Sequence, residues 1–319
     1  MYRLLTTFCN KKKFELRLRA LRHLSLRDLK AERNYWKKFY KLFTDFLYND
    51  IGCYDNYAGG NIKNLRLFFS YLNKDLGLGV GEFYKLFYVR KETIPIFPLL
   101  PEELNFLISD TKFERSLSAR MRQAKDVFVF GCTVALRISD LMALKTSNIR
   151  IVNNKYYLAV RSLKTGTDTL IKLPLYAVEI VLRYSKLRKS LLPYFTASGM
   201  NSYIRELLRL AGFTHPVSKK RERRGEVVEI FPNSQGLSKT FRFCDLATTH
   251  TMRRTAITTM LSLGMPEAVV RKISGHAPGS KEFYRYVLLA QTYQDQESDI
   301  VFEKLKTKQL LEKEASAIS

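Results

Sequence analysis

Hydrophobic residues recur at helical spacing through most of the first third of the chain. Between residues 25 and 47, aromatic and aliphatic positions return every three or four residues, with lysines largely between them. Ser25 followed three positions later by Asp28 has the form of a helix capping box. The same spacing resumes at Ile62, after Gly59–Gly60, which we expect to break the two helices apart. The pattern predicts a small all-helical domain.

Three prolines end this pattern. Pro95, Pro98 and Pro101 exclude a continuous helix, so we expect an extended connector between two domains. The expected segments are a basic N-terminal segment at 1–20, a helical domain at 21–92, a linker at 93–100, a second domain at 101–300 and a C-terminal helix or tail at 301–319.

The second domain begins with helical spacing and then changes period. The segments IRIV, KYYLAVR and TLIKLPL have the form of three short strands, joined at Asn153–Asn154 and at LKTGTD. Beyond Pro174 the helical spacing returns, interrupted by the basic stretch SKKRERRGEVVEIFPNSQG, which we interpret as a loop or hairpin insertion. The expected fold is mainly α, with a helical N-terminal domain and a mixed α/β second domain that holds a small antiparallel three-stranded sheet.

The charge balance of the chain indicates what kind of partner it binds and says little about its fold. Lysine and arginine number 54 against 30 acidic residues, a net charge of +24, which predicts a polyanionic partner. The four cysteines are dispersed without a CxxC pair, so we expect reduced thiols and no metal site. No segment has the form of an export signal or a membrane span, and we expect a cytoplasmic protein with no membrane partner.

Five motifs hold side chains that can bind phosphate or transfer protons. They are ALRISDL with Arg137 and Asp140, LKTGT with Lys164, HTMRRT with His250, Arg253 and Arg254, ISGH with His276, and FYRYV with Tyr284 and Tyr286. His250 and Arg253 are three residues apart, so a helix presents them on one face. Taken singly, each motif has an ordinary explanation, such as a surface ion pair, a solvated turn lysine, a helix-end histidine or a packing tyrosine.

Together, these residue types meet the requirements for cutting a DNA phosphodiester without a metal ion. Two arginines can fork onto the non-bridging oxygens, and each such donor is worth roughly 10²- to 10³-fold in rate. A lysine can protonate the departing 5′ oxygen, and a histidine can take the phenolic proton. A tyrosine, with an ordinary pKa of about 10, needs that help to attack phosphorus.

The order Arg, Lys on a hairpin, His-x-x-Arg, Gly-His, Tyr resembles that of the tyrosine recombinases, which include phage and transposon integrases and chromosome-dimer resolvases. The likeness covers nearly the whole chain and implies a SAM-like core-binding domain followed by a catalytic domain. It implies the following roles: phosphate binding by Arg137, supported by Asp140, and by Arg253; general acid chemistry by Lys164; and catalytic positions for His250 and His276.

The nucleophile is a choice between two tyrosines. The family's commoner spacing from the Gly-His motif falls between Tyr284 and Tyr286, which a helix would place about 200° apart. Tyr286 stands in the family's Arg-Tyr-apolar context, so we select it, with Tyr284 as the alternative. We also expect Arg254, Lys37 and Lys41 to contact DNA outside the reacting centre.

The resemblance implies site-specific cleavage and rejoining of double-stranded DNA through a 3′-phosphotyrosyl intermediate, without cofactor, metal or ATP. It implies a homotetramer on paired sites, at the nucleoid, acting in integration, excision or inversion. The resemblance leaves open whether accessory DNA-bending proteins take part. It also leaves open whether the C-terminal helix docks within its own chain or on a neighbour. The alternatives are a catalytically silent DNA-binding relative, a type IB-like topoisomerase, and a basic helical module without an active site.

Overall fold

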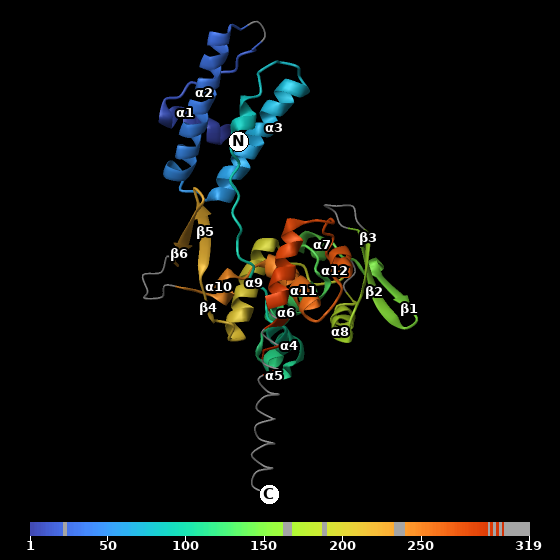
Figure 1. Ribbon diagram of the computed structural model, residues 1–319. Helices are drawn as coiled ribbons and strands as arrows, with labels where there is room; N and C mark the ends of the chain where they lie inside the picture. The colour runs from blue at the N-terminus through green and yellow to red at the C-terminus, as the bar shows by residue number, and fades with distance from the viewer. Residues whose placement is uncertain are drawn as a thin grey trace, which may run out of the picture. The chain divides into compact units, whose positions relative to one another are not determined.

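The computed structural model describes residues 1–21, 24–161, 168–186, 190–232 and 240–292, together with residues 294, 295, 298, 299 and 302. The chain forms two compact units (Figure 1). The first comprises Met1–Pro95 and Ser218–Thr240, and the second comprises Ile96–Val217 and Phe241–Ser319. The division at Pro95 lies inside the expected connector. The basic insertion, however, groups with the first unit and not with the sequence on either side of it.

The first unit is helical apart from one hairpin. Its elements are α1 (Tyr2–Lys12), α2 (Leu26–Asp45), the π-helix η1 (Phe46–Asp50), α3 (Asp55–Lys74), the 3₁₀ helix η2 (Phe83–Leu86), β5 (Lys219–Arg223) and β6 (Glu226–Ile230). Ser25 caps α2 as expected, because its hydroxyl accepts a hydrogen bond from the Asp28 amide. The core between the helices is mainly aromatic, with Phe8, Phe39 and Phe43 fully buried and in mutual ring contact.

The prediction of a helix break at Gly59–Gly60 is wrong. Helix α3 begins at Asp55 and runs through both glycines. A side chain at position 59 would place its Cβ 1.9 Å from the carbonyl oxygen of Arg90. Gly59 therefore allows the segment leading out of the unit to lie directly against the helix, and it has a packing role, not the role of a terminator.

The basic insertion forms the β5–β6 hairpin, which binds the end of the helical unit where α3 begins (Figure 1). Glu92, whose side chain is 1% exposed, accepts two hydrogen bonds from the guanidinium of Arg221 and one from the Glu222 amide. The buried carboxylate of Asp55 accepts from the backbone amides of Arg224 and Gly225 at the hairpin turn. The hairpin thus completes the first unit through charge-assisted hydrogen bonds.

We expect Glu92→Ala to lower the free energy of unfolding of the first unit by about 3 kcal/mol, because the half-buried guanidinium of Arg221 and the amides of Glu222 and Asn56 lose their acceptor. Burial raises the pKa of Glu92, but the hydrogen bonds from Arg221, Glu222 and Asn56 outweigh it, so the pKa lies below its ordinary value. The contribution is therefore present above the ordinary glutamate range and is lost as the pH falls through the lowered pKa.

Chemical denaturation of the full chain at neutral and acidic pH measures this effect. Glu82→Gln is the matched control, since Glu82 belongs to an exposed pair with Lys85 and its replacement leaves the unfolding curve unchanged. Equal unfolding curves for Glu92→Ala and Glu82→Gln would contradict the assignment.

The second unit contains most of the helices and a three-stranded sheet. Its elements are α4 (Pro101–Ser109), α5 (Thr111–Ser116), α6 (Ala119–Val134), α7 (Ile138–Met142), η3 (Thr146–Asn148), β1 (Ile149–Val152), β2 (Lys155–Arg161), β3 (Asp168–Lys172), α8 (Leu175–Arg183), α9 (Ala197–Leu210), β4 (Pro216–Val217), β7 (Phe241–Arg242), α10 (Phe243–Leu246), α11 (Thr249–Ser262) and α12 (Glu267–Ser274). Residues 281–292 are also helical.

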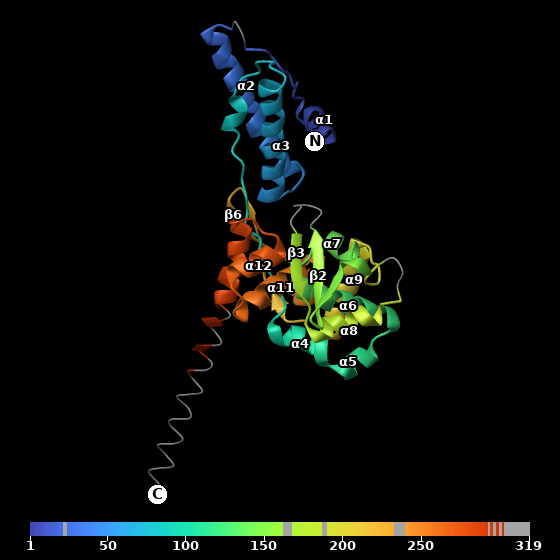
Figure 2. The same ribbon diagram turned by 90° about the vertical axis from the view of Figure 1, so that its right-hand side faces the viewer.

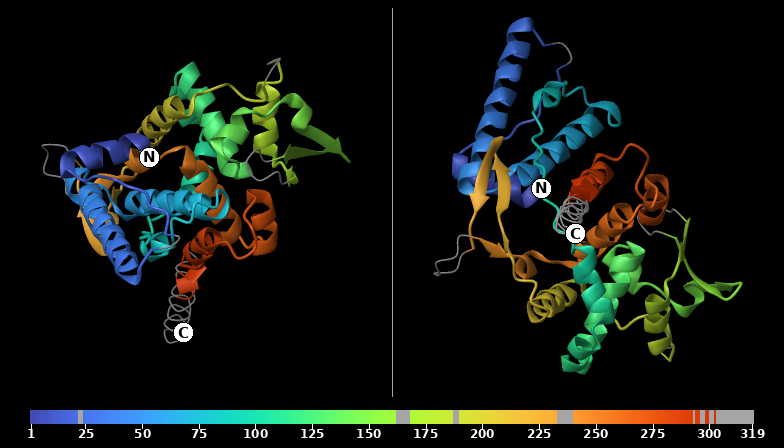
Figure 3. Two further views of the ribbon diagram at one scale, coloured as in Figure 1. Left: turned by 90° about the horizontal axis from the view of Figure 1, so that it is seen from above. Right: turned by 60° about the horizontal axis from the view of Figure 1, so that its bottom comes forward.

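The sheet confirms the expected strands. Its order is β1-β2-β3, with both pairs antiparallel, and Asn153 and Asn154 have positive φ in the first turn. It projects from one edge of the second unit in both views of Figure 3. Strand β3 lies beside α12 (Figure 2), where the Thr169 hydroxyl donates to the Lys272 carbonyl. The second expected turn, which carries Lys164, lies outside the described residues.

Helix α6 is the centre of the second unit. It is buried on almost all sides, with Phe128 and Phe130 fully enclosed, and it packs against α11 and α9. At Gly131 an added Cβ would lie 2.5 Å from the sulfur of Met252, so α6 and α11 approach closely there. No helix in the described part of the chain is long and apolar enough to cross a membrane.

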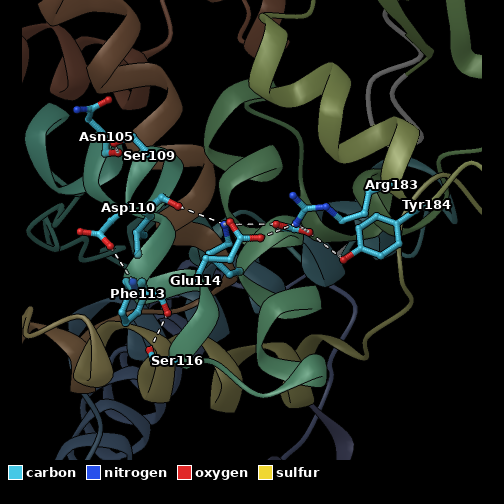
Figure 4. A network of polar contacts seen from close by, with 11 residues as sticks. Asn105, Ser109, Asp110, Phe113, Glu114, Ser116, Arg183 and Tyr184 are labelled. Atoms are coloured by element: carbon cyan, nitrogen blue, oxygen red, sulfur yellow. Dashed lines mark hydrogen bonds and ion pairs between the residues drawn. The ribbon is translucent and has the colours of Figure 1, made fainter.

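A buried charge network joins α5, α6 and α8. Asp126, which is fully buried, accepts hydrogen bonds from Arg183 and from the Tyr184 hydroxyl at 2.7 and 2.8 Å. Lys125 contacts both Glu114 and Asp126, and Glu114 also accepts from Arg183. Figure 4 shows Glu114 of α5 facing Arg183 and Tyr184, which lie together at the end of α8. The network ties three helices that the sequence pattern alone would not connect.

Removing the buried cation tests this network. We expect Lys125→Met to lower the free energy of unfolding by about 3 kcal/mol, because two carboxylates would then share Arg183 alone. Thermal and urea unfolding of the full chain measure it. Arg209→Gln, which removes an exposed pair with Glu206, serves as control and leaves stability unchanged. A Lys125→Met protein as stable as the control would show that the network contributes nothing.

Candidate active site

The guanidinium of Arg253 is buried at the meeting point of three helices. Arg253 lies in the first half of α11 and is 7% exposed. Its Nη1 donates to the carbonyl of Ala135 at 2.8 Å, and its Nη2 donates to the carbonyl of Ser274. Those carbonyls lie at the C-terminal ends of α6 and α12, where helices leave acceptors unpaired. One side chain therefore satisfies two helix ends and holds them together.

Ala135 turns the chain so that Arg137 reaches the same region. It caps α6 in the left-handed conformation, with φ 55° and ψ 20°, which is unusual for a residue with a Cβ. Two residues later Arg137 is the N-cap residue of α7, and its guanidinium lies 4.0 Å from the carboxylate of Asp140. The pairing of Arg137 with Asp140 agrees with the sequence analysis.

His276 follows the end of α12 after Gly275, which has φ 64° and caps the helix in the left-handed conformation. The Nδ1 of His276 lies 2.8 Å from the hydroxyl of Ser274. Its ring packs against Phe283 and Tyr286, with centroid distances of 5.5 and 6.0 Å. Histidine and the candidate nucleophile are thus neighbours in space.

The two candidate tyrosines differ in their surroundings. Tyr286 is half-buried and packs on the apolar cluster that includes Ala135 and Ile257. Tyr284 is 60% exposed. The ring of Tyr286 lies beside that of His276, which follows the end of α12. The geometry therefore groups Tyr286 with His276 and with the cluster at the end of α6, whereas most of Tyr284 is exposed to solvent.

The electrostatics describe a site with excess positive charge. Burial, then Arg253 and Arg137, lower the pKa of His276 to about 4. Burial and Arg137 lower the pKa of Arg253 to about 10, although Tyr286 and Asp140 act in the opposite direction. His250 lies on α11 with its side chain partly open to solvent. Its pKa is also lowered, first by the loss of part of its water and then by Arg254, Arg253 and Arg137. Such a group of cations favours an anion among them.

The structure therefore brings together Arg137, Asp140, His250, Arg253, His276 and Tyr286. Arg254 is half-buried on the same helix, and Lys164 lies outside the described residues. Lys37 and Lys41 are exposed on α2 of the first unit. Within the described ranges, no His, Cys, Asp and Glu side chains gather in a way that could hold a metal ion.

Two positions escaped the sequence analysis, Ala135 and Ser274. Neither has a reactive side chain that marks it, and both act largely through backbone carbonyls. The only available signal was their position at the ends of apolar helices, two residues ahead of Arg137 and His276. A helix end that must place a functional side chain also needs its own carbonyls satisfied.

Comparison with known proteins decides the family. The family model described as the phage integrase family matches residues 99–292, more than half of the 319 residues. The chain belongs to the phage integrase family. Its members are tyrosine recombinases, so the resemblance drawn from the five motifs is confirmed.

Solved structures of other integrases have the same fold as this phage integrase family member. A lambda integrase fragment, determined as a dimer bound to a COC′ core site, matches with a TM-score of 0.54 and 14% identity, over 90% of this chain and 95% of that one. The Tn1549 transposon integrase in complex with transposon right end DNA matches with a TM-score of 0.53 and 14% identity, over 96% and 92% of the two chains. No curated protein sequence matches the chain significantly.

The cationic surroundings of His276 can be measured directly. We expect its imidazole to titrate at about pH 4 in the DNA-free integrase, because burial and two arginines disfavour the charged form. The unfolded chain then binds more protons between about pH 4 and the ordinary histidine value of about 6.5, so stability rises with pH across that window. NMR titration of the full chain, with His276→Asn for assignment, gives the midpoint. A midpoint near the ordinary value would show that Arg137 and Arg253 do not face this ring.

Proposed function

We propose that this chain is a site-specific tyrosine recombinase that cleaves and rejoins double-stranded DNA through a 3′-phosphotyrosyl intermediate at Tyr286. The biological act would be integration or excision of a mobile element, or DNA inversion. The observation that carries the proposal is the grouping of Arg137 and Arg253 with His276 and Tyr286 in the second unit. These are the groups that a phosphodiester needs around it for attack by a phenol.

Arg137 and Arg253 would bind the non-bridging oxygens of the scissile phosphate. Arg253 is held by two carbonyls before any ligand arrives, so its orientation costs little on binding. Asp140 would keep Arg137 in place beside it. Each guanidinium that meets charge developing on the phosphate is worth roughly 10²- to 10³-fold in rate.

In the proposed reaction, the Tyr286 oxygen forms a bond to phosphorus while the bond from phosphorus to the 5′ oxygen breaks. The phenolic proton passes to a histidine, and Lys164 donates a proton to the departing 5′ oxygen. The released 5′ hydroxyl of a partner strand later attacks the phosphotyrosine. Because the covalent intermediate conserves the bond energy, the reaction requires neither ATP nor a metal ion.

Two strand exchanges of this kind would need four chains on paired sites, so we propose a homotetramer. An apolar groove with a volume of about 810 Å³, bounded by β3, α11 and α12, offers a place for a helix. Leu263 and Val269 on its rim are 71% and 45% exposed. The C-terminal segment at 301–319, of its own chain or of a neighbour, is the proposed occupant.

DNA outside the reacting phosphate would be held by basic residues. The net charge of +24 favours a polyanion, and exposed Lys37 and Lys41 on α2, with Arg254 on α11, are the proposed backbone contacts. This partner would place the protein at the nucleoid, where accessory DNA-bending proteins can assist.

Covalent trapping tests the proposal. We expect the full chain to form a protein-DNA adduct on a nicked suicide duplex built from inverted repeats that flank its gene. Tyr286→Phe abolishes the adduct, because it removes the proposed nucleophile, and Tyr284→Phe retains it. Denaturing electrophoresis reads the result.

The other outcomes separate the alternatives. An adduct lost in Tyr284→Phe alone would move the nucleophile to that residue. No adduct on the verified site would favour a silent DNA-binding relative. Relaxation of a plasmid that lacks any target site would favour a type IB-like topoisomerase.

A further inference from the structure

A small cavity lies in the first unit between its helices and the turn of the β5–β6 hairpin. It has a volume of about 140 Å³, enough for several water molecules or one tetrahedral anion. Helices α2 and α3 form two of its sides, and the segment that follows η2 forms a third. Its polar walls come from Tyr40, Thr44, Tyr48, Tyr88, Arg90 and Arg224. None of these residues belongs to the candidate active site, so the cavity is a separate place in the molecule.

The guanidinium of Arg90 is fixed in this cavity by an aromatic ring and a glycine. It lies over the ring of Tyr88, with 5.4 Å between the guanidinium carbon and the ring centroid. It also meets the hairpin turn, where a Cβ added to Gly225 would lie 2.8 Å from its Nη1. Gly225 has a φ of 86°, so the shape of the turn and the space that Arg90 occupies both require a glycine there.

Arg90 has no carboxylate partner within the described part of the chain, where it takes part in no salt bridge. Arg224, by contrast, pairs with Asp45 at 2.7 Å. The buried carboxylate of Asp55 already accepts three hydrogen bonds, from the Tyr48 hydroxyl and from two amides of the hairpin turn. The cavity is therefore lined by two cations, and the charge of one of them is not balanced.

The hydroxyl groups of the cavity walls cannot donate to a ligand. Tyr40 and Thr44 donate to main-chain carbonyls, and Tyr48 donates to the carboxylate of Asp55. Each hydroxyl has one hydrogen, so these hydrogens are already used. The guanidinium N–H groups are the donors that remain, and their planar fork suits the oxygens of a phosphate.

We propose that this cavity binds a phosphate group between Arg90 and Arg224, carried either by the DNA backbone or by a free phosphate or nucleotide. Two guanidinium groups beside one small polar space favour an anion there. The binding groups come from two distant stretches of chain, the segment that follows η2 and the hairpin turn. A bound phosphate would therefore join the hairpin to the helical part of the unit, beside the ion pair of Glu92 with Arg221.

An arginine kept for a ligand should not stabilise the unit when the ligand is absent. In the empty cavity two like charges lie near each other, and one of them lacks an acceptor. We therefore expect Arg90→Gln to be at least as stable as the unmodified chain in chloride. An arginine with a purely structural role would instead lose its contact with Tyr88, and the variant would be less stable.

Unfolding followed by the fluorescence of Trp36 tests the site in the full chain. Trp36 is the one tryptophan of the sequence and lies in the core of the first unit, so its signal reports on that unit. The probe is inorganic phosphate, compared with chloride at equal ionic strength. We expect the denaturation midpoint to rise with phosphate until the site is full, because the anion binds the folded form. Arg90→Gln should weaken the apparent phosphate affinity about ten-fold, the loss of one charge-assisted contact. Arg90→Lys, which keeps the charge without the fork, should weaken it less.

Arg66→Gln is the matched control, since Arg66 is a half-buried arginine of α3 that does not line the cavity. It should keep the full response to phosphate. Equal responses of Arg90→Gln and Arg66→Gln would overturn the inference and mark the effect of phosphate as non-specific. An Arg90→Gln chain that is less stable in chloride, yet keeps its response to phosphate, would likewise show an arginine that only packs.

DNA binding distinguishes the two sources of phosphate. Fluorescence anisotropy with a duplex of random sequence, at several salt concentrations, measures how many phosphates the chain neutralises. If the phosphate belongs to DNA, Arg90→Gln lowers the slope of log affinity against log salt by about one contact. If it belongs to a free phosphate or nucleotide, the slope is unchanged and phosphate still stabilises the duplex-bound chain. No cleavage is needed, so failure to form the covalent adduct would leave this result untouched.

Discussion

The candidate active site depends on the burial of one guanidinium. Arg253 loses its water, so its donors must find acceptors within the protein, and it takes the carbonyls of Ala135 and Ser274. Arg137 follows the first carbonyl by two residues, and His276 follows the second by two. The positions of Arg137 and His276 therefore depend on the two helix ends that Arg253 holds together. A single interaction therefore sets the distance between residues that are far apart in the chain, and the remaining contacts refine it.

Much of this could be predicted from the sequence because it is local. The capping of α2 by Ser25, the three strands and the turn at Asn153–Asn154 follow from neighbouring residues. The order of the five motifs was enough to indicate the family, which the match to residues 99–292 confirms. Gly59 shows where prediction from sequence fails. A glycine that permits close packing inside a helix cannot be told from a glycine that ends a helix by the sequence alone.

What could not be predicted depends on contacts between distant segments. The β5–β6 hairpin has a recognisable turn, but its partners Asp55 and Glu92 lie more than a hundred residues earlier. Its sequence is basic, and two of its arginines, Arg221 and Arg224, bind carboxylates of the first unit. Part of the positive charge of the chain is thus used internally. Ser274 is a similar case, because its importance arises only once α12 is set beside Arg253.

The most direct test of the account is the structure of the full chain bound to a duplex that carries its own site. The account predicts that the guanidinium groups of Arg137 and Arg253 contact non-bridging oxygens of one and the same phosphate, with the Tyr286 oxygen facing the phosphorus. Contacts of the two arginines with different phosphates, or with none, would contradict it.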